Sequence, residues 1–129
     1  MNKTYLITAA VLGALSVMLG AFGAHGLKTR MSTDAFEIFE TAVKYQFYHV
    51  FALLAVAIVY QYIPASLLNW SGRCFVAGIL FFSGSLYLLS YFKMIDNQQM
   101  NWLGAITPFG GFCFIVGWML LAIATIKAR

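Results

Sequence analysis

Charged side chains are scarce in this sequence. Lys, Arg, Asp and Glu make up 9% of the 129 residues, whereas hydrophobic residues make up 62%. An average soluble domain carries roughly 25% charged residues, and one of this length could not hide several long apolar runs in a single core. The composition therefore excludes an ordinary soluble domain. It indicates a membrane protein, because runs of about 20 apolar residues can cross a bilayer as helices.

Cysteine and histidine are also scarce, with two of each. Cys74 and Cys113 lie inside apolar runs without CxxC or His-ligand spacing, so we interpret them as small packing residues. The formal net charge of +4 is not gathered into a basic stripe, so nucleic acid is not an expected partner. The sequence contains no nucleophile elbow, HExxH motif or phosphate loop. We therefore predict neither an enzymatic activity nor a cofactor.

The apolar runs predict an all-α fold, an integral membrane four-helix bundle that forms one domain over residues 1–129. The expected spans are 5–24, 46–63, 74–92 and 103–126. The first run resembles a secretory signal, but it is long enough to span, and we expect it to be retained. Basic residues are balanced between the two sides. Because the terminal side carries no acids, we expect both termini in the cytoplasm and the protein in the plasma (inner) membrane.

The connection between the first two runs is charged and amphipathic. Asp34 can cap a helix, with Glu37 three residues later, and Glu40 and Lys44 are spaced for an i,i+4 ion pair. Apolar residues recur there at helical spacing, namely Phe36, Phe39, Val43 and Phe47. We expect an amphipathic helix over about 34–45 that lies at the membrane interface and runs into the second span.

Small residues recur at helical spacing on three of the predicted spans. In lipid, helices associate through close backbone contact at such residues. We predict helix-packing contacts at Gly13, Gly20, Gly23, Gly84, Gly104 and Gly111. Heptad spacing also relates Gly78 to Ser85 and Gly110 to Gly117. Three such faces are more than one small bundle obviously requires, so the expected partners are a second copy or a larger membrane complex. Packing within one protomer is the alternative.

Pro108 is expected to bend the fourth span, where Thr107 could bond a freed carbonyl.

Polar side chains of the spans gather in one half of the membrane, opposite the termini. The candidate polar site consists of His25, Tyr45, His49, Tyr87, Ser90 and Thr107. Because consecutive spans are antiparallel, His25 and His49 are expected to approach the same membrane face.

Three interpretations of these polar residues remain open. They could form an interhelical hydrogen-bond network, or line a cavity for a lipid head group or small amphiphile. They could also form a metal, haem or proton site at His25 and His49, joined by Glu40. We favour the network, because two histidines without a ligand motif are weak evidence for a metal. On the network interpretation the protein is a packing or accessory subunit; on the cavity interpretation it binds or carries an amphiphile.

Four blocks of the sequence carry a resemblance to a known family. They are "GAFGAHGL", "FETAVKYQFYHVFALL", "GILFFSGSLYLL" and "ITPFGGFCFIVGW", in this order. The combination resembles the YgdD/YwdK-like bacterial inner-membrane proteins, a family built on domain of unknown function 423 with a vertebrate four-span relative. The resemblance covers essentially the whole chain. It implies that the first span is retained and that the blocks containing His25, His49 and Pro108 are family signatures. It implies no activity.

Overall fold

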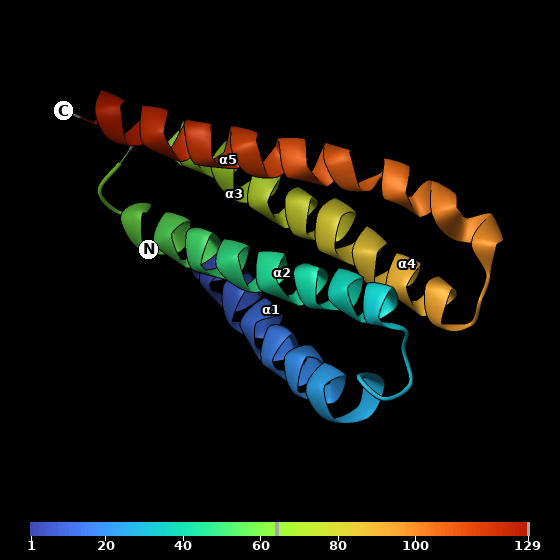
Figure 1. Ribbon diagram of the computed structural model, residues 1–129. Coiled ribbons are helices and arrows are strands. Elements are labelled where there is room, and N and C mark those ends of the chain that lie inside the picture. Colours follow the sequence, from blue (N-terminus) through green and yellow to red (C-terminus); the bar gives the residue numbers. More distant parts are fainter. Residues whose placement is uncertain (64, 129) are drawn as a thin grey trace.

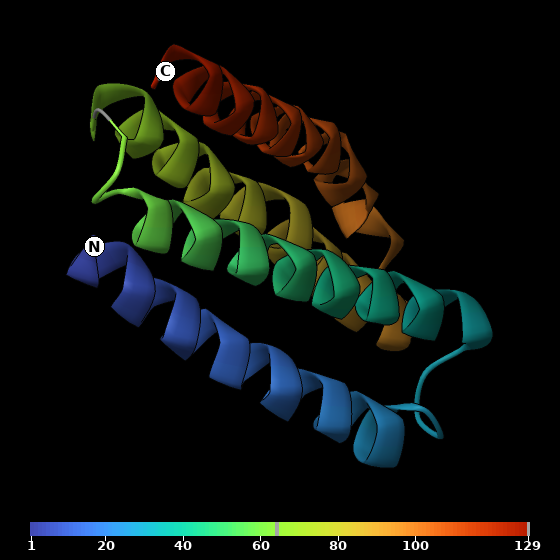
Figure 2. The same cartoon turned by 90° about the vertical axis from the view of Figure 1, so that its left-hand side faces the viewer.

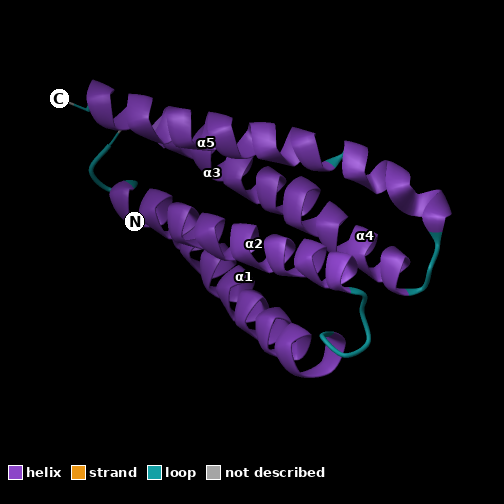
Figure 3. Ribbon diagram, in the orientation of Figure 1, coloured by secondary structure: helices purple, strands orange, loops and turns teal. Residues whose placement is uncertain are grey.

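The computed structural model describes residues 1–63 and 65–128, and all regular structure in them is helical (Figure 3). The elements in chain order are α1 (Lys3–Phe22), the π-helical turn η1 (Gly23–Leu27), α2 (Thr33–Val59), α3 (Ala65–Gly78), the π-helical turn η2 (Ile79–Ser83), α4 (Gly84–Met94), the 3-10 helix η3 (Gln98–Ala105) and α5 (Thr107–Lys127). They join into four long helices, each long and apolar enough to cross a membrane.

The long helices are stacked in a row. α1 packs on α2, α2 packs on η2 and α4, and α5 packs on α3 and η2, an order that Figure 2 shows from one end to the other. The N-terminus and the C-terminal end of α5 lie at the same end of the bundle (Figure 1). In their most apolar stretches, 44% of α2 but only 17% of α1 is buried. The outer helices therefore present most of their apolar surface to the surrounding lipid.

α2 begins well before the apolar run that predicted it. The helix starts at Thr33, so the amphipathic stretch forms its first turns, and the apolar side of that stretch is packed. Ser32 is the N-cap: its Oγ accepts a hydrogen bond from the Ala35 N–H at 3.3 Å. The prediction that Asp34 caps the helix was wrong by two positions. Asp34 lies in the first turn instead, where a carboxylate is favoured by the helix dipole.

The fourth long helix changes from 3-10 to α-helical geometry just before Pro108, instead of bending at the proline as predicted. The 3-10 helix η3 gives way to α5 at Ile106, and Pro108 stands in the first turn of α5. A proline there removes no hydrogen bond, because the first N–H groups of a helix have no partner within it. Thr107 does not bond a freed carbonyl as predicted; its hydroxyl bonds that of Ser85 at 2.7 Å.

The small face of α1 lies against α2. A Cβ added at Gly13 would lie 3.4 Å from Val50, and one added at Gly20 would lie 3.5 Å from Val43. These are near-ordinary van der Waals distances. At Gly23 an added Cβ would strike the Phe39 ring, so Gly23 is the tightest point of the contact.

Glycine and phenylalanine interlock where the third long helix meets α5. Gly78 faces the Phe114 ring, Gly117 faces the Phe75 ring, and Gly110 lies against the backbone of Phe82. Ser71 adds a hydrogen bond of 2.7 Å from its hydroxyl to the carbonyl of Gly117. Since both helices come together at glycines, the backbones approach closely enough for this bond.

The close contacts in this half of the molecule differ from those predicted. A Cβ at Gly84, Gly104 or Gly111 would meet nothing closer than 3.8 Å. Gly78 and Gly84 are six residues apart and lie more than about 100° apart around the helix axis, so only the former faces α5. On α5, Gly110 and Gly111 differ by about 100° around the axis, which turns Gly111 out of the contact.

Candidate functional site

Gln46 is the centre of a hydrogen-bond chain across three helices. The Tyr87 hydroxyl donates to Gln46 Oε1 at 2.8 Å, and Gln46 Nε2 donates to the Leu12 carbonyl at 2.9 Å. Gln46 is buried, with 4% of its surface exposed. The chain therefore ties α4, α2 and α1 together inside the apolar bundle.

Serine hydroxyls make the remaining polar contacts of this region. Ser83 donates to the Ala42 carbonyl at 2.8 Å, which joins η2 to α2. Ser85 bonds the Phe82 carbonyl at 2.9 Å and the Thr107 hydroxyl at 2.7 Å. Ser90, predicted as part of the site, bonds only within its own helix, to the Tyr87 carbonyl at 2.8 Å.

In the described part of the chain, every fully buried side-chain nitrogen or oxygen has a hydrogen-bond partner. These hydrogen bonds are important in a bilayer, because an unpaired polar group in hydrocarbon is unfavourable. This arrangement supports the network interpretation for Tyr87 and Thr107. Gln46 was not singled out from the sequence. The feature that could have indicated it is a single amide side chain within an apolar run.

His49 lies near the middle of α2 and is buried, with 6% of its surface exposed. Its ring stacks on Phe114 with centroids 3.4 Å apart and planes inclined by 6°. Nδ1 lies 2.7 Å from the Tyr45 carbonyl. A carbonyl can only accept, so Nδ1 carries the proton, and Nε2 of the neutral ring is left with a lone pair.

An aromatic groove opens between α2 and α5 beside this ring. Its volume is about 620 Å³, and it is lined by Tyr45, His49, Phe82, Pro108, Gly111, Phe112, Phe114, Ile115 and Trp118. Tyr45 is 39% exposed, and its ring centroid lies 4.5 Å from that of Phe82. The groove therefore combines stacked rings with one imidazole nitrogen that bonds no described residue.

The structure separates the two histidines. His25 is exposed in η1, beyond Gly23, which packs against Phe39 in the early turns of α2. His49 lies next to Val50, which packs against Gly13 in the middle of α1. The expectation that they approach the same membrane face was wrong for His49, because the predicted span began at Gln46, whereas the turns from Thr33 onwards are packed as part of the same helix.

Metal-ligating side chains do not converge in the described residues. No three of His, Cys, Asp and Glu lie close enough to hold an ion among them. Glu40, which could have joined the histidines, lines a separate crevice between α1 and α2.

Four long apolar helices joined by an internal hydrogen-bond network define an integral membrane protein of the helical-bundle class. Residues 19–111 match a family described as protein of unknown function DUF423. The chain belongs to this family.

The relatives match nearly the whole chain. UPF0382 membrane proteins from Staphylococcus saprophyticus and Staphylococcus aureus are similar at 42% and 43% identity over 125 residues, which cover 97% of this chain and at least 97% of each relative. The UPF0382 membrane protein YwdK of Bacillus subtilis is 38% identical over 126 residues, or 97% of this chain and 98% of the relative. No solved structure matches the chain.

Proposed function

We propose that this membrane protein binds a small amphiphile with a flat, hydroxyl-bearing ring in the groove between α2 and α5. The observation that carries the proposal is His49: its neutral ring stacks on Phe114 and lines an aromatic groove, and its Nε2 bonds no described residue.

The hydrogen-bond state of His49 determines what the occupant must supply. Nδ1 is committed to the Tyr45 carbonyl, so Nε2 can only accept. Saturated acyl chains offer no donor, and an unpaired imidazole nitrogen in hydrocarbon is unfavourable. A hydroxyl on the occupant would satisfy it.

The lining and volume of the groove agree with a ring-shaped occupant. Aromatic pairs prefer stacked or edge-to-face contacts, and Tyr45, Phe82 and Trp118 provide such faces around His49. A volume of about 620 Å³ falls within the roughly 300–1,000 Å³ of small-molecule sites. We assign the groove no catalytic step.

The accessory-subunit role stays a second prediction with weaker support. Its premise was a surplus of glycine faces, but Gly23, Gly78, Gly110 and Gly117 are all in close contact with phenylalanines of the same chain. We also propose the plasma membrane as the location, with cytoplasmic termini. Lys3, Arg73 and Lys127 at the terminal end, where no acid lies, support this orientation.

Fluorescence titration with a matched pair of probes tests the binding proposal. Trp118 lines the groove, so a Trp70→Phe, Trp102→Phe protein in lipid nanodiscs reports binding there. We expect para-dodecylphenol to change the Trp118 emission and to bind about fivefold more tightly than its methyl ether, which lacks the donor. His49→Phe keeps a ring against Phe114 and should abolish this difference.

A pair of glycine variants provides the control. Gly111→Leu should fill the groove, since an added Cβ there lies 3.8 Å from Phe82 and meets no backbone. Gly104→Leu adds the same side chain outside the groove and should leave binding unchanged. Equal affinities for the phenol and the ether in the tryptophan-reduced parent protein would refute donor recognition by His49.

A further inference from the structure

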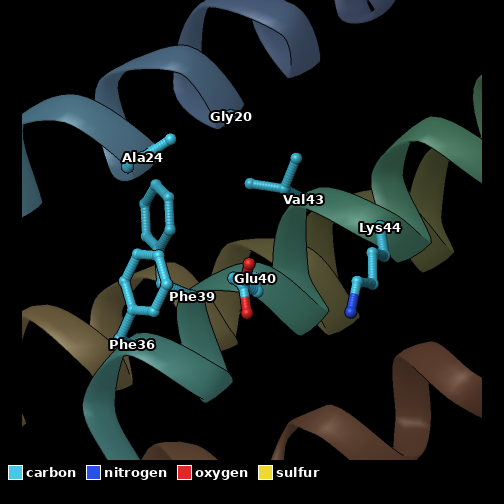
Figure 4. Close-up of a pocket in the computed structure, with 8 residues that line it drawn as sticks. Gly20, Ala24, Phe36, Phe39, Glu40, Val43 and Lys44 are labelled. Atoms are coloured by element: carbon cyan, nitrogen blue, oxygen red, sulfur yellow. The ribbon is translucent and has the colours of Figure 1, made fainter. Parts of the chain in front are cut away.

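A second, smaller crevice lies between the end of α1 and the first half of α2. Its walls are Gly20, Gly23 and Ala24 on one side and Phe36, Phe39 and Val43 on the other (Figure 4). Its volume of about 170 Å³ is below the roughly 300–1,000 Å³ of small-molecule pockets. The crevice can therefore hold a segment of an apolar chain but not a whole ligand.

Two opposite charges stand at the edge of this crevice. Glu40 and Lys44 line it and are both exposed, and they precede the apolar run that begins at Gln46. Their spacing predicted an ion pair, but Figure 4 shows the Lys44 ammonium set apart from the Glu40 carboxylate. A carboxylate and an ammonium that do not pair with each other thus stand on one helix face, just before the apolar run of α2.

We propose that this crevice is a binding site for a phospholipid with an ethanolamine head group. The ammonium of the head group donates to Glu40, Lys44 donates to the phosphate, and the upper part of one acyl chain lies against Gly20 and Val43, which face each other at the deeper end of the crevice. The order of charges matches, because ammonium and phosphate are neighbours in this head group, as Glu40 and Lys44 are on one helix face.

Charge and donor complementarity favour this head group over the other common ones. An anionic head group without an ammonium would satisfy Lys44 but would leave the Glu40 carboxylate facing negative charge. A choline head group carries the positive charge on a quaternary nitrogen, which has no N–H to donate. A primary ammonium has three donors and forms charge-assisted hydrogen bonds to carboxylates.

Native mass spectrometry of the full chain tests the site directly. The protein in detergent is given an equimolar mixture of dioleoyl phosphatidylethanolamine, phosphatidylcholine and phosphatidylglycerol, and the retained lipid is identified by mass. We expect one ethanolamine lipid to be retained about two- to fivefold more than either other lipid. The preference is small because exposed charge contacts contribute little binding free energy.

Three variants distinguish head-group recognition from general lipid binding. Glu40→Gln should remove the preference for ethanolamine, and Lys44→Gln should lower retention of all three phospholipids. Glu37→Gln, which removes an exposed acid outside the crevice, is the matched control and should change nothing. Circular dichroism checks that each variant is folded.

Two results would overturn the proposal. One is a wild-type protein that retains phosphatidylglycerol or phosphatidylcholine at least as well as phosphatidylethanolamine. The other is a folded Glu40→Gln protein with the wild-type preference. Since the crevice and the aromatic groove share no residue, either result leaves the groove proposal standing.

Discussion

At the scale of single residues, the packing of this bundle depends on which glycines face a neighbouring helix. Gly110 is the extreme case: an added Cβ would lie 2.7 Å from the Phe82 Cβ and closer still to its backbone nitrogen. A backbone cannot move aside as a side chain can. Gly20, by contrast, borders the α1–α2 crevice and has ordinary space around it.

Gly110→Ala should therefore destabilise the protein, by about 1–3 kcal/mol as in overpacked cores. Gly20→Ala is the matched control on an outer helix and should leave stability within about 0.5 kcal/mol of wild type. Thermal unfolding in detergent, followed by circular dichroism, measures both. A Gly110→Ala protein as stable as Gly20→Ala would show that the helices do not touch at Gly110.

The Tyr87–Gln46–Leu12 chain makes a second prediction at this scale. Tyr87→Phe and Gln46→Leu should each lower stability, and the double variant should lose less than the sum of the two. We expect a coupling energy of about 0.6–1.7 kcal/mol, from the average to the largest value found for hydrogen bonds between membrane helices. Additive losses in this double-mutant cycle would mean that the two side chains do not interact.

At the scale of elements, the π-helical turn η2 determines which residues of α3 and α4 face the neighbouring helices. A π-helical hydrogen bond spans five residues rather than four, so the turn holds one residue more than an α-helical turn. This extra residue changes the phase between Gly78, which faces Phe114, and Ser90, which is fully buried on α4.

Deletion of one residue distinguishes this turn from ordinary helix. Removing Leu80, which is exposed within η2, should convert the turn to α-helix. Because the π-helical turn holds one extra residue, the residues of α3 and α4 should keep their orientations toward the neighbouring helices. Removing Leu88, which is exposed within α4, should rotate Ser90 by about 100° and disrupt packing. We expect the Leu80 deletion to retain the higher unfolding temperature; the reverse order would contradict the assigned role of η2.

The elements also show what the sequence could and could not predict. The four membrane helices were predictable because apolar runs of this length have few other uses. The placement of the first turns of α2 was not, because their charges favoured a helix lying along the membrane interface, whereas these turns pack in line with the second span. That error moved His49 towards the membrane surface and suggested a meeting with His25. Heptad spacing selected both Gly78 and Gly84, but spacing within one helix does not say which of the two faces a neighbouring helix, and only Gly78 does.

At the scale of the whole molecule, the row of helices explains why a groove exists. α2 and α5 both pack on the third long helix but have little contact with each other, so the space between them stays open. His49 is buried against Phe114 of α5, and its ring contributes to the wall of the groove of about 620 Å³.

The account predicts that the groove is occupied by an amphiphile in the native membrane. The most direct measurement is to extract the protein with its surrounding lipid, without detergent, and to identify the small molecules that co-purify by mass spectrometry. Wild-type protein and Gly104→Leu should carry the same ring-bearing hydroxylated amphiphile, and Gly111→Leu should lack it. Identical small-molecule content in folded wild-type and Gly111→Leu protein would contradict a binding site in the groove.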